Sequence, residues 1–351
     1  MTLLHMDGFE GYGKEDVLSF WDTGSYIDVT SLIDQTGRRG GYCLNAPDRT
    51  STSDWRLRWS NTNIIDEQVM IVGCAFRMGA SLGNATQSFL TIKNPMGSII
   101  ANVGIDTDYT ISVSYSPSNT NQILYISEIL DQNVWYYLEL KGHMSSPGGI
   151  VVCRLNEQII YENYNLDTVA YQASGTKIGS VQFYISSYNR IAIDDIYILD
   201  TTGSKNNDFL GDIRVDSIHP NGAGNYSQLT PSAGNNYECV DETNMNSADY
   251  VEGANAGEKD SYTYGSVPTD LDDAAIYGIQ LRNQVVRTAE SDNIKMKGFL
   301  RTGSTDYEES IEQSLSTIYK SKRIVWEDDP SDSNSWTQAK INACEFGMEV
   351  A

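Results

Sequence analysis

The sequence is poor in the residues that carry most enzyme and metal chemistry. It has only three histidines among 351 residues, and none of them stands in a legible Ser/His/Asp or Cys/His arrangement. The five cysteines form no CxxC pair, so their spacing predicts neither a zinc site nor a disulfide framework. We expect reduced, mostly buried thiols of a protein folded in a reducing cytoplasm at Cys43, Cys74, Cys153, Cys239 and Cys344.

Basic residues and long apolar runs are also scarce. Only 24 Lys and Arg residues oppose 47 Asp and Glu residues, which gives a net charge of −23. Nucleic acids and anionic membrane surfaces bind clustered positive charge, so we expect neither as a partner. No run of about 18 apolar residues occurs. The first residues, "MTLLHMDGFEGYG", lack the basic and apolar regions of a signal peptide, and we expect none.

The acidic residues do not follow the pattern of a glycoside hydrolase. A retaining enzyme needs two carboxyl groups about 5–5.5 Å apart, which on one strand face means acids at i and i+2 or i+4. The run "YISEILD" instead places Glu128 and Asp131 three residues apart, on opposite faces of a strand. We therefore predict no catalytic residues and a protein that is not an enzyme.

The residues that are abundant favour strands and tight turns, including 22 Tyr and 29 Gly. Short alternating runs such as "VMIVGCAFRM" (Val69–Met78) and "SVQFYIS" (Ser180–Ser186) recur at spacings of roughly 10 to 20 residues. Turns rich in Gly, Asn and Ser separate them. This pattern predicts a mainly β chain that begins with an antiparallel sandwich or jelly roll.

The length predicts two domains, because 351 residues are too many for one ordinary core. The polar, turn-rich segment "TTGSKNND" (Thr201–Asp208) is the expected linker. We place a jelly-roll domain at 1–204 and a second β-rich domain at 205–351. The first strand of the second domain is expected in "FLGDIRVDSIHP" (Phe209–Pro220).

Two segments of the second domain depart from the pattern of short strands. Residues 220–262 are long and polar with few strand-length runs, which predicts an extended arm that contacts a neighbouring subunit. The segment "STDYEESIEQSLSTIYKS" (Ser304–Ser321) carries apolar residues at helical spacing, with acids early and lysines late. We expect a helix there, and at most one or two helices in the chain.

The first domain resembles concanavalin-like and laminin-G-like jelly rolls. In "VWYYLELKGHMSSPGGIVVCRLNEQIIYE", Trp135 opens a strand, and a second strand ends in a short loop at Asn156–Glu157. The run "IAIDDIYIL" (Ile191–Leu199) is similar to the closing strand of such domains, which pairs with an N-terminal strand, here "MDGFEGYG" (Met6–Gly13). The resemblance implies the fold and no single function, because these folds host lectins, enzymes and structural modules alike.

The second domain resembles a narrower group. The string "FLGDIRVDSIHPNGAGNYSQLTPSAGNNYECVDE" is similar to a segment of tailed-bacteriophage structural proteins that follows an N-terminal jelly roll. The ending "IVWEDDPSDSNSWTQAKINACEFGMEV" is similar to their C-terminal end. The resemblance implies a non-enzymatic virion protein assembled in the host cytoplasm, favoured as a tail fibre, tip or adaptor component that contacts host glycan.

Other functions and partners remain open at this point. A capsid-surface decoration or head-fibre protein fits the same features, and a free carbohydrate-binding protein or glycanase is the alternative from another class. The expected partners are other virion proteins and copies of the chain itself, as a homo-oligomer and, by analogy with phage appendages, a trimer. We expect no required cofactor. A structural Ca²⁺ is one interpretation of the acidic residues Asp7, Glu10, Asp194 and Asp195.

Asp194 and Asp195 are adjacent acids in the middle of a strand-like run. Neighbours on a regular strand point to opposite faces, so both can enter one site only at a β-bulge. One interpretation is a structural Ca²⁺ bound by these residues together with Asp7 and Glu10 of the first strand. The other is that the acids accept hydrogen bonds from backbone amides across the seam between the first and last strands.

Tyr136, Tyr184 and Tyr188 are candidate contacts for carbohydrate. Sugar rings pack on aromatic faces, so tyrosines on a sheet can form a stacking platform. Half of the aromatics on an alternating strand face the core instead, so packing is the ordinary role for each of the three.

Overall fold

The computed structural model describes most of the chain, and every structural statement below refers to that part. The described residues are 2–11, 13, 17–23, 33–34, 36–45, 54–60, 68–79, 87–116, 122–169, 177–186, 190–271, 274–289 and 293–351. They are mainly β, and their α-helices are the short α1 (Val17–Phe20) and α2 (Gln338–Asn342). The predicted fold class, with at most one or two helices, is confirmed. No helix in the described ranges has the length and apolar character needed to span a bilayer.

The chain divides into two compact units. Unit 1 comprises Met1–Glu10 and Trp21–Val215, and unit 2 comprises Gly11–Phe20 and Asp216–Ala351. The boundary therefore falls at Val215 rather than at the expected residue 204, and a short N-terminal segment belongs to the second unit. Each unit is described by itself below.

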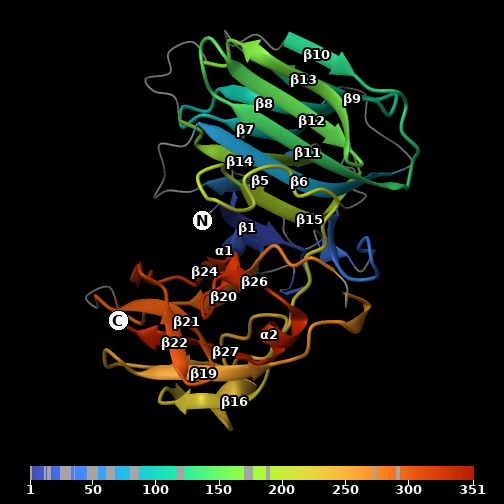
Figure 1. Ribbon diagram of the computed structural model, residues 1–351. Coiled ribbons are helices and arrows are strands. Elements are labelled where there is room, and N and C mark those ends of the chain that lie inside the picture. Colours follow the sequence, from blue (N-terminus) through green and yellow to red (C-terminus); the bar gives the residue numbers. More distant parts are fainter. Residues whose placement is uncertain are drawn as a thin grey trace. The chain divides into compact units, whose positions relative to one another are not determined.

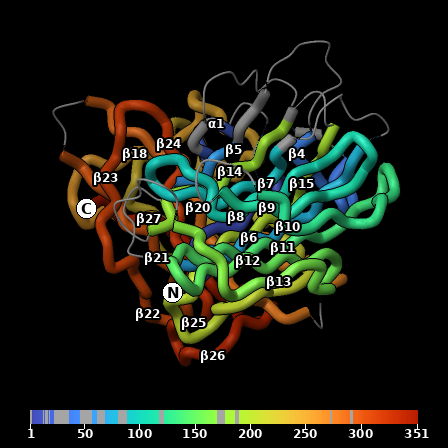
Figure 2. The backbone as a smooth tube through the Cα atoms, turned by 90° about the horizontal axis from the view of Figure 1, so that it is seen from above, coloured from blue at the N-terminus to red at the C-terminus, as the bar shows by residue number. Residues whose placement is uncertain are grey.

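Unit 1 is a sandwich of two antiparallel sheets (Figures 1 and 2). Sheet A has the strand order β13-β12-β11-β6-β15-β4-β3, with β1 also paired to β15. Sheet B has the order β10-β9-β8-β7-β14-β5-β2. The strands of sheet A are β1 (Leu3–Asp7), β3 (Ile33–Asp34), β4 (Cys43–Asn45), β6 (Val69–Met78), β11 (Trp135–His143), β12 (Gly149–Leu155), β13 (Gln158–Leu166) and β15 (Ile191–Leu199). Those of sheet B are β2 (Asp22–Thr23), β5 (Asp54–Ser60), β7 (Gln87–Lys93), β8 (Ile99–Ile105), β9 (Ile111–Tyr115), β10 (Gln122–Ile126) and β14 (Ser180–Ser186).

The inner faces of the two sheets form the core of unit 1. Phe76 of sheet A packs against Phe89 of sheet B with ring centroids 5.4 Å apart, and Phe89 packs against Phe183. All three rings are buried. Alternation along each strand places the intervening residues on the outer faces of the sheets, so each sheet has a second face that something else must cover or solvate.

The closing strand does pair with an N-terminal strand, but that strand is Leu3–Asp7 rather than the predicted Met6–Gly13. β1 runs antiparallel to β15, with Met6 opposite Tyr197 and Asp7 opposite Ile196. The closing strand β15 is buried along its whole length. A strand buried on both faces shows that the outer face of sheet A is covered at this point.

Unit 2 is built on sheet C, with the order β16-β19-β27-β21-β22 and β23 also paired to β21 (Figure 1). One face of sheet C packs on an apolar cluster that includes Leu300, Phe346 and Trp336. The strands of sheet C are β16 (Pro220–Ser227), β19 (Lys259–Tyr264), β21 (Lys295–Thr302), β22 (Thr305–Glu308), β23 (Gln313–Ser314) and β27 (Cys344–Val350). Smaller pairs are β17 (Thr230–Pro231) with β18 (Val251–Glu252), β20 (Ile279–Val285) with β24 (Lys320–Trp326), and β25 (Asp328–Asp329) with β26 (Asn334–Ser335).

The prediction that residues 220–262 form an extended arm is wrong. β16 occupies its first eight residues and pairs with β19, and the 3-10 helix η2 (Asn236–Cys239) lies between them. The buried carboxylate of Asp260 holds the segment in place through hydrogen bonds. It accepts hydrogen bonds from the backbone N–H groups of Gln228 and Leu229 and from side-chain donors of Asn236 and Tyr262. A polar segment is thus ordered by a buried acceptor together with the burial of Leu229, Cys239 and Tyr262.

The predicted helix at 304–321 is also wrong. Residues 295–308 form the β21–β22 hairpin, and Gly303 has a φ of +60° in its turn. The apolar residues whose spacing suggested a helix do not share a buried face, since Ile311 and Ile318 are 67% and 63% exposed. The glycine that permits the hairpin lies one residue before the helical pattern begins. The second 3-10 helix, η3 (Thr269–Leu271), adds no further helical face.

Candidate functional site

A β-bulge places Asp194 and Asp195 on the same side of sheet A. The register between β15 and β6 shifts between Asp194 and Tyr197, and Asp195 has a φ of +48°. Both carboxylates then reach Arg38. Asp194 accepts the backbone N–H of Arg38 at 2.8 Å, and Asp195 lies 3.5 Å from its guanidinium. The bulge that the sequence required for a shared site is therefore present.

Both acids are buried, at 2% and 3% exposure. Burial and the neighbouring charge of Asp195 raise the pKa of Asp194 to about 7, and burial also raises the pKa of Asp195. Each carboxylate also accepts a hydrogen bond from a further backbone N–H. Asp194 accepts from Asp195, and Asp195 accepts from Val215, both at 2.8 Å. The two carboxylates thus fix the backbone at Arg38, Asp195 and Val215, although burying their negative charge opposes folding.

Residues 208–215, here called the strap segment, lie on the outer face of sheet A. Glu139 of β11 is fully buried and accepts the backbone N–H of Gly211 at 2.8 Å and the hydroxyl of Tyr197. Leu210 donates its backbone N–H to Tyr197. The ring of Phe209 lies against two cations of the sheet, with the guanidinium of Arg154 at 5.0 Å.

Ion pairs also hold the strap segment and the side chains beneath it on the outer face of sheet A. Arg154 forms an ion pair with Glu139 at 3.1 Å, and Arg38 with Asp212 of the strap segment. A side chain at Gly73 would collide with the ring of Tyr197, so the glycine lets that tyrosine lie across β6. The expectation that "FLGDIRVDSIHP" is the first strand of the second domain is therefore wrong. Most of that segment has no strand structure, and its backbone N–H groups are bound by side chains of unit 1.

The four residues proposed for Ca²⁺ have other partners within unit 1. Asp7 accepts the backbone N–H of Phe9 at 3.0 Å and the indole N–H of Trp21 at 2.8 Å. Glu10 lies between Gly8 and Gly41, where added Cβ atoms would meet its carboxyl oxygens. Among the described residues, no three His, Cys, Asp or Glu side chains are grouped so as to hold a metal ion. The Ca²⁺ site, with Asp194 and Asp195, stays a prediction.

The three candidate tyrosines do not form one platform. Tyr136 packs on Phe76 with ring centroids 5.8 Å apart, on the inner face of sheet A, and its hydroxyl accepts the backbone N–H of Asp131. Tyr184 lies on the outer face of sheet B, between the buried Phe183 and Ile185 of β14. Tyr188 lies outside the described residues.

A polar row crosses the outer face of sheet B beside Tyr184. Direct strand partners run from Arg58 on β5 to Gln182 on β14, Thr91 on β7, Asn102 on β8 and Ser114 on β9. We call these five residues the sheet-B row. Thr91 donates to Asn102 at 2.9 Å, and Asn102 donates to Ser114 at 3.0 Å. These three side chains are no more than 3% exposed and form a floor of hydroxyl and amide groups.

Longer side chains flank this floor. Lys93 donates to the amide oxygen of Gln182 at 2.9 Å and to the hydroxyl of Tyr184 at 2.6 Å, and its ammonium lies 5.3 Å from the centre of the tyrosine ring. Tyr184 also donates to Gln182. Sequence reasoning named Tyr184 alone. The other members are ordinary polar residues in separate strands, and only the strand order brings them together.

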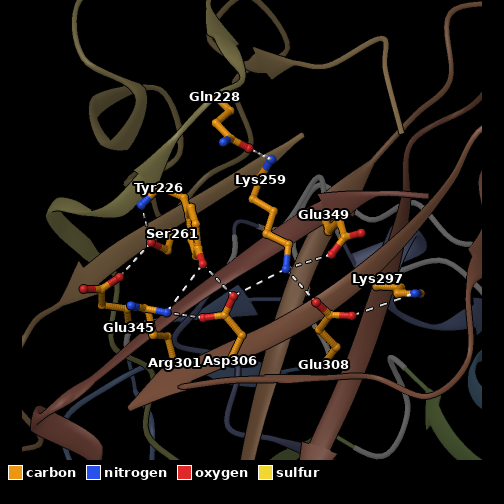
Figure 3. Close-up of polar contacts among 10 residues, drawn as sticks. All are labelled: Tyr226, Gln228, Lys259, Ser261, Lys297, Arg301, Asp306, Glu308, Glu345 and Glu349. Atoms are coloured by element: carbon orange, nitrogen blue, oxygen red, sulfur yellow. Dashed lines mark hydrogen bonds and ion pairs between the residues drawn. The ribbon is translucent and has the colours of Figure 1, made fainter. Parts of the chain in front are cut away.

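Unit 2 carries a different polar surface on the outer face of sheet C (Figure 3). At its centre Lys259 contacts three carboxylates, with Glu308 at 2.6 Å, Glu349 at 3.0 Å and Asp306 at 3.4 Å. Arg301 pairs with Asp306, whose other oxygen accepts the hydroxyl of Tyr226. Sequence reasoning missed this cluster, because its members lie on the five strands β16, β19, β21, β22 and β27, which only the pairing of sheet C brings together.

The cluster of Figure 3 is internally balanced. Burial opposes ionisation of Asp306, but hydrogen bonds from Arg301 and Tyr226 outweigh it and hold its pKa below the ordinary value. The pKa of Glu308 is lowered by its hydrogen bond from Lys259. Each cation faces at least one carboxylate of the same cluster. The arrangement therefore suits the stabilisation of a solvent-facing sheet surface.

Comparison with known proteins gives partial structural matches. No protein-family model and no curated protein matches the chain. A carbohydrate esterase of Shiga toxin-encoding bacteriophage phi24B is 14% identical, covers 56% of this chain and 99% of its own, and has a TM-score of 0.38. The alginate lyase Aly36B, solved with an alginate trisaccharide, is 9% identical over 57% of this chain and 98% of its own, with a TM-score of 0.43. A Trypanosoma rangeli sialidase matches at 10% identity over 48% of this chain but only 26% of its own, with a TM-score of 0.34.

These matches bear on two predictions, that the chain is not an enzyme and that it is a virion protein. The prediction that the chain is not an enzyme is contradicted, because the similar structures are mostly carbohydrate-active enzymes. At these identities and TM-scores no particular activity transfers to this chain. One of the structures comes from a phage, while the place of this chain in a virion stays a prediction. The chain has a mainly β, jelly-roll-like fold.

Proposed function

We propose that the chain is a component of a tailed-phage virion, placed on the tail, and that its jelly roll contacts host glycan through the outer face of sheet B. The observation that carries the glycan contact is the half-buried cluster of Lys93, Gln182 and Tyr184, whose ammonium, amide and hydroxyl groups lie together on this face. Hydroxyl and amide side chains both donate and accept hydrogen bonds, as sugar hydroxyls do. An aromatic ring adds a surface for the C–H face of a sugar.

The other polar surfaces fit this role less well. The strap segment covers the outer face of sheet A. Its backbone N–H groups donate to the hydroxyl of Tyr197 and to the carboxylate of Glu139. The outer face of sheet C balances its charges within the cluster of Figure 3. The sheet-B face, in contrast, carries the half-buried side chains of Lys93, Gln182 and Tyr184, where the cation contacts only neutral groups.

A glycan array probed with the full chain tests the contact. We expect binding to a subset of glycans, and a loss of about tenfold in affinity for Tyr184→Ala, as expected when an aromatic contact of roughly 1.4 kcal/mol is removed. The matched control is Tyr164→Ala, which removes a tyrosine that is 54% exposed on β13 of the other sheet. Equal binding by the two variants, or no binding by folded wild type, would overturn the proposal.

Two further measurements address turnover and location. Release of new sugar ends from each bound glycan distinguishes an enzyme from a binding protein, and either result is compatible with contact at sheet B. Antibody labelling of intact virions is expected to mark the tail. Labelling of the capsid instead would favour the decoration or head-fibre alternative, and its absence from virions would favour a free carbohydrate-binding protein or glycanase.

A further inference from the structure

Basic side chains of unit 1 fall into two groups. Beneath the strap segment each cation contacts a carboxylate: Arg38 contacts Asp195 and Asp212, Arg154 contacts Glu139, and Lys141 contacts Asp208. This is the ordinary outcome in a chain with 47 acidic and only 24 basic residues. A cation without a carboxylate partner is therefore unusual here.

Lys93 is such a cation. Its ammonium contacts the neutral oxygens of Gln182 and Tyr184, and no carboxylate lies within ion-pair distance among the described residues. These two hydrogen bonds use two of its three N–H groups and leave one donor. The residue is half-buried, so water compensates its charge only in part.

Arg58 lies on the same face, between Gln182 of β14 and Asp22 of β2 in the strand register. It lies directly opposite Gln182 in the strand register, so its side chain projects from the same face as that residue. Its Nε is shielded from solvent and has no hydrogen-bond partner in the described part of the chain. Lys93 and Arg58 thus approach Gln182 from the two neighbouring strands, β7 and β5.

We infer that the glycan bound at the outer face of sheet B is anionic and presents sugar carboxylates to Lys93 and Arg58. This inference rests on the proposed glycan contact and names its substrate class. A carboxylate would supply the counter-charge that Lys93 lacks in the described part of the chain, and the fork of Arg58 can bind both of its oxygens. Gln182 and Tyr184 would then meet the hydroxyl groups of the same sugar.

Arg77 supplies a matched control. It is another cation without a carboxylate partner among the described residues, but it lies on sheet A, where it donates to Thr36 at 3.1 Å and stacks over Trp135 at 4.9 Å. Arg77→Gln therefore removes the same kind of charge from the opposite sheet. A general effect of net charge on binding would act in both variants, whereas a site effect would act only at sheet B.

The test is titration calorimetry of the full chain with oligogalacturonate, oligomannuronate and sialyllactose, each compared with its uncharged methyl ester. We expect at least one acid to bind about tenfold tighter than its ester at low salt, and the preference to shrink as salt is raised. Lys93→Gln and Arg58→Gln are each expected to remove most of the preference, while Arg77→Gln leaves it unchanged. Lys93→Arg keeps the charge and is expected to keep the preference, which guards against misfolding of the Gln variant.

The outcomes separate the two proposals. Acids and esters that bind equally well would overturn the anionic inference and leave the glycan contact standing. A preference that Arg77→Gln reduces as much as Lys93→Gln would overturn the placement at sheet B. No binding of any of these probes overturns the inference, and the glycan array then decides separately whether the contact itself fails.

Discussion

On the outer face of sheet A, Arg38, Lys141 and Arg154 contact carboxylates and the strap segment lies over them, whereas on the outer face of sheet B, Lys93 contacts only neutral oxygens. The two faces belong to the same sandwich and are both polar. What differs is where the partners of the polar groups come from. The cations beneath the strap segment have carboxylate partners within the chain, whereas the described partners of Lys93 on sheet B are neutral, so Lys93 can still pair with an anionic ligand.

The largest effect is expected when a partner is removed from the face that the chain itself completes. Glu139→Ala deletes the acceptor for Gly211 and Tyr197 and leaves Arg154 without its carboxylate. Breaking a buried pair in this way costs about 3–5 kcal/mol. Urea unfolding of the full chain is expected to show a free energy of unfolding lowered by that amount.

The control for this variant is Lys93→Gln on sheet B. Lys93 loses only hydrogen bonds to neutral groups, so we expect a change in unfolding free energy below about 1 kcal/mol. Similar costs for the two variants would remove the distinction between a completed face and an open one.

The next effect is a dependence of stability on pH in unit 1. The pKa of Asp194 is raised to about 7 by burial and by Asp195, while an unfolded Asp releases its proton near 4. Between these values the folded state holds a proton that the unfolded state has lost. The unfolding free energy contributed by this pair therefore falls as pH rises from about 4 to 7, by up to about 4 kcal/mol.

Hydrogen exchange of the β15 amides at pH 5 and pH 8 measures this effect, with rates corrected for intrinsic exchange. We expect weaker protection at pH 8, and a smaller difference in Asp194→Asn, which keeps the acceptor for Arg38. Protection that rises with pH in the wild type would contradict the assigned direction.

The smallest effect is expected on the surface of unit 2. Lys259→Gln leaves three carboxylates facing one another, but they are partly solvated and two retain other cations, so we expect a loss of about 1 kcal/mol. The lowered pKa values of Asp306 and Glu308 give the opposite pH sign to unit 1, because their contribution is present above about pH 4 and is lost on acidification. Urea unfolding at pH 7 and at pH 3.5, compared between variant and wild type, checks both points. A loss that persists undiminished at pH 3.5 would contradict the role of these pairs.

The sequence predicted those parts of the fold that local pattern determines. Alternation located strands such as β6 and β14, and the acidic closing strand β15 pairs with an N-terminal strand as expected. The condition for Asp194 and Asp195 to share a side was also predicted, although whether the bulge exists depends on β6, the strand beside them.

The rest depends on contacts between residues that are distant in the chain. Asp260 orders residues 220–262 through hydrogen bonds that no local pattern signals. The strap segment alternates like a strand, yet its amides find Glu139 and Asp195 instead of a neighbouring strand. The sheet-B row is visible only once the strand order is known, because its members come from five separate strands.

The most direct test of the central claim is hydrogen exchange of the full chain with and without the carboxylated oligosaccharide that binds best. We predict slower exchange confined to β5, β7 and β14 around Gln182, with no change in β11 or β15 beneath the strap segment. Protection located in β11 and β15, with β7 and β14 unchanged, would contradict the claim that the outer face of sheet B is the open binding face.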